Sequence, residues 1–286
     1  MVEIVKQARA AFSMLNAHEV MTRAERPVTV GLVADGSGAY AEMEDFLLPE
    51  RTPRAARRAR MRQVFRASDR EVPSEVDVVL YEPGLACPAN AYTFHRGHAE
   101  ETVAEILRDN RGLALALARQ YPPFRKPVIE GIIHEVAREN ALFALATAVP
   151  NIFPSFIELP WIFGEFASDT VFLTANQVRM AFQIAAAAGR KVGIVEQKGE
   201  LVAIAAGAFG WRAIARELVG HIPLGGGLIP KGAVAYAGTF VVGKGLEFYL
   251  HASRQPGPEE RKRLYREGLE HGRSFAQSWQ AGGSGA

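Results

Sequence analysis

Residues 201–250, LVAIAAGAFGWRAIARELVGHIPLGGGLIPKGAVAYAGTFVVGKGLEFYL, decide the fold of the C-terminal half of this chain. Over 201–220 the apolar side chains recur at steps of three and four residues, the pattern of a helix with one buried face. Pro223 and the glycines at 225–227 end that helix, because proline has no amide hydrogen and glycine costs backbone entropy. Pro230 fits the first turn of a second helix, where no amide hydrogen is needed. The stretch therefore predicts a helical hairpin.

The second helix of the hairpin is rich in small residues. Gly232, Gly238 and Gly245 lie along it with alanines between them, and small side chains let a neighbouring helix approach closely. A membrane-spanning helix needs about 20 mostly apolar residues. The uncharged part of this helix, 233–242, is much shorter and is bracketed by lysines. We expect a buried or surface-bound hairpin, and a membrane-spanning hairpin stays as the alternative.

The composition is that of an ordinary globular protein. The chain has 286 residues, of which 48% are hydrophobic and 22% charged, and its net charge is +2. This suffices for a sizeable core in one large or two small domains. The single cysteine, Cys87, excludes an internal disulfide framework and fits a reducing compartment. Because the N-terminus also lacks the apolar run of a secretory signal, we expect a cytoplasmic protein, free or peripheral on the inner face of the plasma membrane.

A strand, a glycine-containing loop and a helix follow one another between residues 28 and 48. The valine-rich run 28–33 predicts a buried strand, and residues 40–48 predict a helix. Backbone amides of such a loop and the N-terminus of the helix bind phosphate in many proteins. The loop residues in question are Asp35, Gly36, Ser37, Gly38 and Tyr40. The alternative is a plain strand-to-helix connection in an α/β domain.

Residues 34–41, ADGSGAYA, resemble the phosphate-binding loop GxxxxGK[ST] of Era-like GTPases. Tyr40 stands in place of the lysine that reaches the β and γ phosphates, and Ala41 in place of the hydroxyl that binds magnesium. After the next predicted strand, Glu82 and Gly84 lie in a DxxG-like motif whose aspartate is absent. The resemblance implies a degenerate P-loop-like α/β domain that has lost GTPase chemistry and takes no cofactor.

Residues 51–70, RTPRAARRARMRQVFRASDR, contain eight arginines and one acidic residue. Arg54, Arg58, Arg62 and Arg66 recur at steps of four, so on one helix they form a stripe of positive charge. Like charges at this spacing repel, and an anionic partner stabilises them. That partner is a set of acidic residues of the chain itself, such as Glu42, Glu44 and Asp45, a phospholipid surface or a nucleic acid. A solvated segment without a binding role is the alternative. Because aromatic residues hardly interleave the arginines, we expect no nucleic acid.

No set of residues predicts a metal site or a catalytic centre. His95 and His98 are three residues apart and have glutamates nearby, but no third ligand follows at a suitable spacing. We expect a surface cluster there, without a metal. The other histidines are scattered, and no Ser-His-Asp or Cys-His arrangement is indicated, so we expect that the protein is not an enzyme.

The C-terminal half resembles the YcjF-like domain, a domain of unknown function found beside or fused to Era-like bacterial GTPases. The resemblance covers about 125–250 and rests on three stretches, KPVIEGIIHEVARENALFAL, LTANQVRMAFQIAAAAGRKVG and HIPLGGGLIPKGAVAYAGTFVVGKG. Relatives of this kind are helical and often associated with membranes, and they have no established catalytic residues. The resemblance therefore implies a helical domain without an active site.

We therefore predict an α/β domain followed by an all-α domain. A helix over 1–26 precedes a small degenerate P-loop-like α/β domain over 27–122. A helical domain over 123–255 carries the Gly/Ala-rich hairpin, and a helix over 256–280 and a flexible tail over 281–286 follow. The expected function is a non-catalytic, GTPase-like scaffold or adaptor. Its helical domain would bind a membrane surface with anionic lipid, a protein partner or a second copy of the chain. A nucleotide-binding switch with an atypical phosphate loop and an integral or pore-forming protein are the alternatives.

Overall fold

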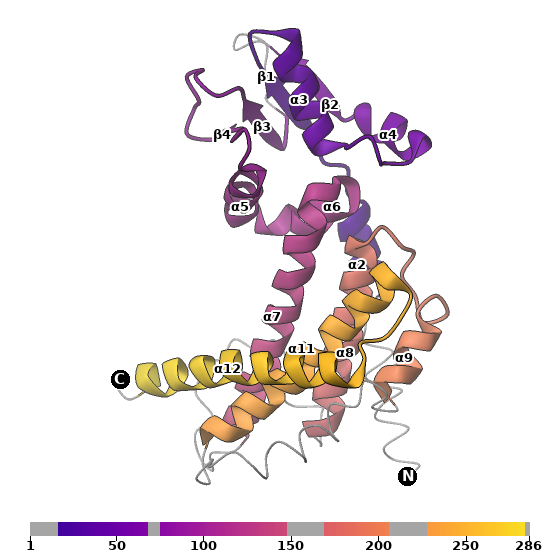
Figure 1. The fold of residues 1–286 in the computed structure, drawn as a ribbon, viewed down its shortest axis with the longest axis vertical. Coiled ribbons are helices and arrows are strands. Elements are labelled where there is room, and N and C mark those ends of the chain that lie inside the picture. Colours follow the sequence, from indigo (N-terminus) through magenta and orange to yellow (C-terminus); the bar gives the residue numbers. More distant parts are fainter. Residues whose placement is uncertain (1–16, 68–74, 148–168, 206–227, 284–286) are drawn as a thin grey trace. The chain divides into compact units, whose positions relative to one another are not determined.

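The computed structural model describes residues 17–67, 75–147, 169–205 and 228–283 (Figure 1). The chain divides into two compact units. The first, called the α/β unit below, comprises the described residues of 19–129 together with 186–191. The second, the helical unit, comprises those of 1–18, 130–185 and 192–286. An α/β part followed by a helical part agrees with the sequence, except that residues 186–191 return to the first unit.

A four-stranded parallel sheet forms the centre of the α/β unit, with the strand order β2-β1-β3-β4. Val33 at the end of β1 pairs with Ala67 of β2 on one side and with Tyr81 of β3 on the other. The apolar run of β1 is buried along its whole length, as expected for a central parallel strand. The strands are β1 (Val30–Val33), β2 (Val64–Ala67), β3 (Val78–Tyr81) and β4 (Tyr92–Thr93).

Helices and short 3-10 turns complete the α/β unit. Helix α5 ends before Asn110, whose side-chain amide donates to the Ile106 carbonyl (3.0 Å) and to the Tyr92 hydroxyl (2.7 Å). The elements are α2 (Ala17–Glu25), α3 (Ser37–Leu47), α4 (Arg54–Met61), α5 (Ala99–Asp109), η1 (Arg111–Leu113), α6 (Ala114–Gln120) and η2 (Pro122–Phe124).

The end of α6 fixes the start of β1. The Gln120 side chain accepts a hydrogen bond from the Val28 amide (3.2 Å) and donates one to the Arg26 carbonyl (2.7 Å). The buried Tyr121 hydroxyl donates to the Val28 carbonyl at 2.8 Å. Burial raises the pKa of Tyr121, so its hydroxyl stays protonated and remains a donor. These bonds satisfy backbone groups just before the strand that would otherwise be buried without partners.

Helices alone form the described part of the helical unit. Helix α11 corresponds to the second helix of the predicted hairpin. Of the residues predicted for the first helix, 201–205 belong to α9 and 206–220 lie outside the described residues. The last helix extends to Gly283 and so takes up part of the predicted flexible tail. None of the described helices is both long enough and apolar enough to cross a bilayer. The helices are α7 (Arg125–Ala146), α8 (Asp169–Ala187), α9 (Lys198–Ala205), α11 (Leu228–Ala252) and α12 (Pro258–Gly283).

Glycines bring the helices of this unit close together. A Cβ atom added to Gly232 of α11 would lie 2.9 Å from Leu145 of α7. Gly238 and Gly245, the other two glycines predicted to pack helices, are buried. On α12, a Cβ atom at Gly272 would lie 2.9 Å from the backbone of α11. Small residues therefore set the distances from α11 to both neighbouring helices.

A buried chain of polar side chains joins α7, α8 and α11. The Asn176 amide donates to the Asn140 side-chain carbonyl at 2.9 Å, and the Asn140 amide donates to the Thr239 hydroxyl at 2.8 Å. The Thr239 hydroxyl in turn donates to the Ala235 carbonyl at 2.9 Å. Asn140 is fully buried, so its hydrogen bonds are needed to offset the loss of water.

The N-terminus of α12 yields a prediction about ionisation. The Gly257 amide donates to the Glu260 carboxylate at 2.8 Å, and the Arg254 guanidinium donates to both its oxygens at 2.8 and 3.1 Å. This is the reciprocal half of a capping box, with glutamate at the third helical position. The hydrogen bond from Arg254 and then the one from the Gly257 amide lower the pKa of Glu260 to about 2.

We therefore expect an NMR titration of the Glu260 carboxylate to give a midpoint of about 2. In Arg254→Met the midpoint should move towards the ordinary glutamate value of about 4.3. Because the folded-state pKa is lowered, this cap stabilises the protein above the unfolded pKa. The stabilisation is lost as pH falls through the folded pKa. A wild-type midpoint that Arg254→Met leaves in place would contradict the assignment.

Candidate functional site

The carboxyl ends of β1 and β3 form the first candidate site. These strands are neighbours in the centre of the sheet. The chain runs from β1 towards β2 on one side and from β3 towards β4 on the other. Loops that leave two adjacent parallel strands in opposite directions open a crevice at the strand ends, where α/β proteins commonly bind ligands. Both motif remnants identified in the sequence follow these two strands.

The two remnants contact each other at this edge. The Asp35 amide donates to the Glu82 carboxylate at 3.1 Å. Arg96 lies beside the same carboxylate at 3.3 Å and pairs with Glu42 of α3 at 2.7 Å. The Glu82 carboxylate thus accepts the hydrogen bond of a loop amide that could otherwise bind a phosphate, and Arg96 balances its negative charge. The site is an internal ion-pair network at the place where a phosphate-binding loop would hold its ligand.

The loop between β1 and α3 is shorter than the sequence suggested. Helix α3 begins at Ser37 instead of Tyr40, with Gly36 as the residue that precedes it in extended conformation (φ −129°, ψ 151°). Ser37 and Gly38 therefore belong to the first helical turn and only residues 34–36 connect strand and helix. The prediction of a longer glycine loop was wrong because helix α3 extends one turn further towards β1 than its apolar pattern indicates.

Two further remnant residues have structural roles. The Tyr40 hydroxyl, at the position of the missing lysine, donates to the Ala67 carbonyl at the end of β2 (2.9 Å). Gly84 has a φ of +96°, and the Leu85 amide donates to the Glu82 carbonyl at 3.2 Å. With Pro83 before it, this is a turn that needs glycine at its third position. The turn therefore accounts for a glycine at position 84, and no bound ligand is needed to explain it.

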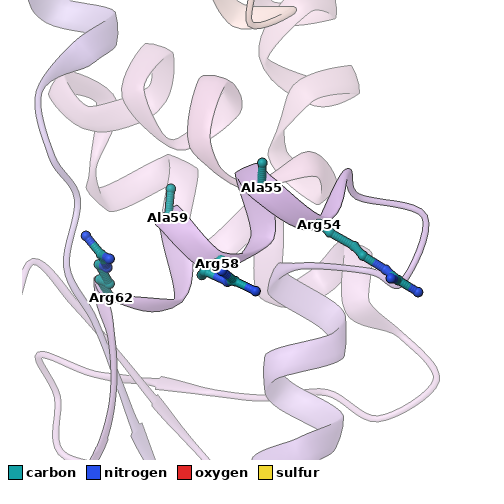
Figure 2. Close-up of a pocket in the computed structure, with 5 residues that line it drawn as sticks. All are labelled: Arg54, Ala55, Arg58, Ala59 and Arg62. Atoms are coloured by element: carbon teal, nitrogen blue, oxygen red, sulfur yellow. The ribbon is translucent and has the colours of Figure 1, made fainter.

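The arginine helix α4 is the second candidate site (Figure 2). Five exposed residues of α4 and of the residue that follows it line an open pocket of about 380 Å³: Arg54, Ala55, Arg58, Ala59 and Arg62. No side chain of α4 is buried. Across the described ranges, no acidic residue pairs with the three arginines of this group. We call Arg54, Arg58 and Arg62 the arginine face.

The neighbouring arginines have internal partners and do not belong to this face. Arg57 pairs with Asp45 at 2.6 Å. Arg66 donates to both oxygens of Glu44 at 2.7 and 2.9 Å and lies over the Tyr40 ring at 5.4 Å. The predicted four-residue stripe from Arg54 to Arg66 is therefore wrong at its end, because α4 stops at Met61 and Arg66 lies in strand β2.

Neither Arg96 nor Glu42 was predicted to belong to the strand-edge network. Arg96 follows β4, which has only two residues and leaves no recognisable apolar run. Had β4 been predicted, a charged residue just after it would have been expected at the same edge as Asp35 and Glu82. His95 lies 3.4 Å from Glu105. Across the described ranges no three histidine, cysteine or acidic side chains are grouped to hold a metal ion.

Comparison of the chain with models of protein families, with curated protein sequences and with solved structures gave no match. The resemblances to Era-like GTPases and to the YcjF-like domain therefore remain predictions from the sequence. The function has to be argued from the two sites themselves.

Proposed function

We propose that this protein is a non-catalytic adaptor of the pseudo-GTPase type that binds an anionic membrane surface through the arginine face of α4. The observation that carries the proposal is the exposure of Arg54, Arg58 and Arg62 on one short helix without a carboxylate partner in the described residues. Arginines that stabilise the fold of this unit, such as Arg57 and Arg66, are paired. The unpaired ones are available for an external anion.

The strand-edge network supports the non-catalytic part of the proposal. A bound phosphate would have to displace the Glu82 carboxylate from the Asp35 amide or lie against it, and like charges in contact repel. Tyr40 offers no cation in place of the lysine, and its hydroxyl is engaged with Ala67. Phosphoryl transfer depends on positive charge placed around the transferred group, and the cation at this edge, Arg96, is already paired with Glu82 and Glu42.

The size of the face favours a membrane over a protein partner. Between the arginines lie Ala55 and Ala59, so the face offers no aromatic side chain to anchor a protein partner. Each arginine near an anionic leaflet contributes about 1 kcal/mol. Three arginines then contribute about 3 kcal/mol, which corresponds to about a hundredfold in binding. Such binding is peripheral, reversible and weakened by salt.

Flotation with liposomes tests the proposal. Wild-type protein should float with vesicles that contain phosphatidylserine at low salt, and neither with neutral vesicles nor at high salt. In Arg58→Glu/Arg62→Glu the bound fraction should fall at least about tenfold, because two attractions of about 1 kcal/mol each become repulsions. The control is Arg263→Glu/Arg266→Glu, which changes the net charge equally at two exposed positions of α12. Equal flotation of the α4 variant and the wild type would contradict the proposal.

The position of the strand-edge network at the carboxyl ends of β1 and β3, where α/β proteins commonly bind ligands, supports the nucleotide-switch hypothesis as a second candidate. Thermal unfolding with millimolar GTP or ATP and magnesium separates the two. We expect no shift of the midpoint in the wild type. A shift that grows with nucleotide concentration would favour the switch, and GTP hydrolysis by the purified protein would contradict the adaptor.

A further inference from the structure

The helical unit contains a pocket that the proposed function does not use. It is an open pocket of about 790 Å³ lined by α7, α11 and α12. Besides two serines, its lining residues are Gly131, His134, Arg138, Tyr236, His271 and Phe275. The lining contains one cation, two imidazoles and two aromatic rings, but no carboxylate.

Two histidines and a tyrosine are in contact on one side of the pocket. Nδ1 of His134 lies 2.6 Å from the Tyr236 hydroxyl, and the rings of His134 and His271 meet edge to face with centroids 5.2 Å apart. Burial raises the pKa of Tyr236, so the phenol keeps its proton, and we assign its O–H as the hydrogen-bond donor to Nδ1. The neutral His134 ring then carries its own proton on Nε2. That N–H is a hydrogen-bond donor for a ligand.

Arg138 adds a permanent positive charge to the rim. It is exposed, and across the described ranges no carboxylate pairs with it. Arg179 of α8, in contrast, pairs with Glu139. A guanidinium binds carboxylates and phosphates through two parallel hydrogen bonds. An unpaired arginine beside imidazole donors is therefore suited to an anion.

Gly131 is the most informative residue of the lining. It lies inside helix α7, where glycine costs about 1 kcal/mol relative to alanine. At Gly232, Gly243, Gly268 and Gly272 an added Cβ atom would come within 2.9 Å of a neighbouring residue, whereas at Gly131 it would meet nothing within 4 Å. Neither close packing nor backbone conformation requires this glycine. Its effect is to widen the pocket by one side chain.

We propose that this pocket binds a small organic anion, a carboxylate or phosphate joined to an apolar or aromatic group. The acidic group contacts Arg138 and the imidazole N–H, and the apolar group lies against Tyr236 and Phe275 in the space left by Gly131. A metal ion fits less well, since a structural or catalytic metal site needs at least three protein ligands. An uncharged ligand would leave Arg138 without its counter-charge.

Binding should strengthen as pH falls. Burial, followed by the charges of His271, Arg138 and Lys244, lowers the pKa of His134, while Glu130 raises it. The free pocket therefore holds a neutral His134 at pH 7. An anion next to the ring favours the imidazolium and raises its pKa. Ligand binding then takes up a proton, so affinity rises from pH 8 to pH 6.

Calorimetric titration of the full chain with phenyl phosphate tests the proposal. Inorganic phosphate and benzyl alcohol provide the anion and the ring separately, and each should bind at least about tenfold more weakly. Arg138→Gln and Gly131→Leu should each reduce the affinity about tenfold or more, the first by removing the charge and the second by filling the space. Arg266→Gln on the exposed side of α12 is the control and should leave binding unchanged. Phenylacetate, which stays ionised above pH 6, serves for the pH series.

Three results would overturn the inference. The first is that phenyl phosphate does not bind at about ten millimolar and pH 6. The second is that wild type and Arg138→Gln bind phenyl phosphate with equal affinity, and the third is that wild type binds phenyl phosphate and benzyl alcohol with equal affinity. Since Arg138 is exposed, Arg138→Gln should keep the fold even if Gly131→Leu does not, and circular dichroism checks both. The titration contains no lipid and leaves α4 unchanged, so its outcome is independent of the membrane proposal.

Discussion

Gly272→Ala is expected to lower the free energy of unfolding by about 2–3 kcal/mol, whereas Gly131→Ala is expected to raise it by about 0.5–1 kcal/mol. The same methyl group is added to a helix interior in both cases. Alanine is the better helix former at either position. Only the surroundings of the added methyl group differ, so the pair separates the effect of packing from that of helix propensity.

The surroundings of Gly272 cannot give way. Its added Cβ atom would lie 2.8 Å from the Cβ atom of Tyr236, and 2.9 Å from both the Cα atom and the carbonyl oxygen of Ala233. Backbone atoms of α11 move only if the helix moves, so α12 would have to shift away along the whole contact. Interiors are packed too densely to absorb such a shift without cost. At Gly131 the methyl group meets open space.

Denaturant unfolding followed by circular dichroism measures both changes. The midpoints of the two variants should move in opposite directions at constant m-value. Gly36→Ala is a control in the α/β unit, since its added Cβ atom also meets nothing within 4 Å and it lies outside the helical unit. If Gly272→Ala were as stable as Gly131→Ala, the close approach of α11 and α12 would be wrong.

The glycines show what a sequence pattern conveys and what it omits. The hairpin stretch identified α11 as a helix with a small-residue surface, and Gly232 does lie against α7. Which helix meets which glycine is decided by contacts between residues far apart in the chain. Periodicity describes a single helix and carries no information on its partner. Gly272 therefore could not be assigned to the contact with α11.

The strands of the sheet were likewise predicted only in part. Strands β1 and β3 were predicted because each is a continuous apolar run. Strand β2 was missed because it is a partly exposed edge strand, VFRA, directly after the arginine helix, and there the charge pattern suggested a longer helix. The order β2-β1-β3-β4 results from non-local pairing. The order of the two motif remnants implied that Asp35 and Glu82 would lie near each other. It did not imply that Arg96 would join them.

The organic-anion pocket had no sequence signal. His134 and Tyr236 are hydrogen-bonded although 102 residues separate them, and each lies on a different helix. In the sequence both appear as single polar or aromatic residues within apolar helices, and such residues most often belong to a core. The unusual feature is a glycine in the middle of α7, and its meaning depends on the empty space beside it.

Asn140→Leu is expected to lower the free energy of unfolding by about 2–3 kcal/mol, although leucine has nearly the shape of asparagine. Asn140 is fully buried and bonds to Asn176 and to Thr239. The substitution leaves the Asn176 amide buried without the acceptor it has in the wild type. An unsatisfied buried donor costs about 1–3 kcal/mol, and the lost bond to Thr239 adds to this. The Thr239 hydroxyl keeps its hydrogen bond to the Ala235 carbonyl, so most of the lost stability comes from the unsatisfied Asn176 amide.

The double variant Asn140→Leu/Asn176→Leu separates this cause from a loss of packing. When both partners become apolar no donor is left unsatisfied, so the double variant should regain at least half of the stability lost by the single variant. If instead the two losses simply added, the side chains would contribute through packing alone. The network also joins α7 to α11, and these two helices supply His134 and Tyr236. Asn140→Leu should therefore weaken phenyl phosphate binding even under conditions where the variant remains folded, because the pocket depends on the register that the network fixes.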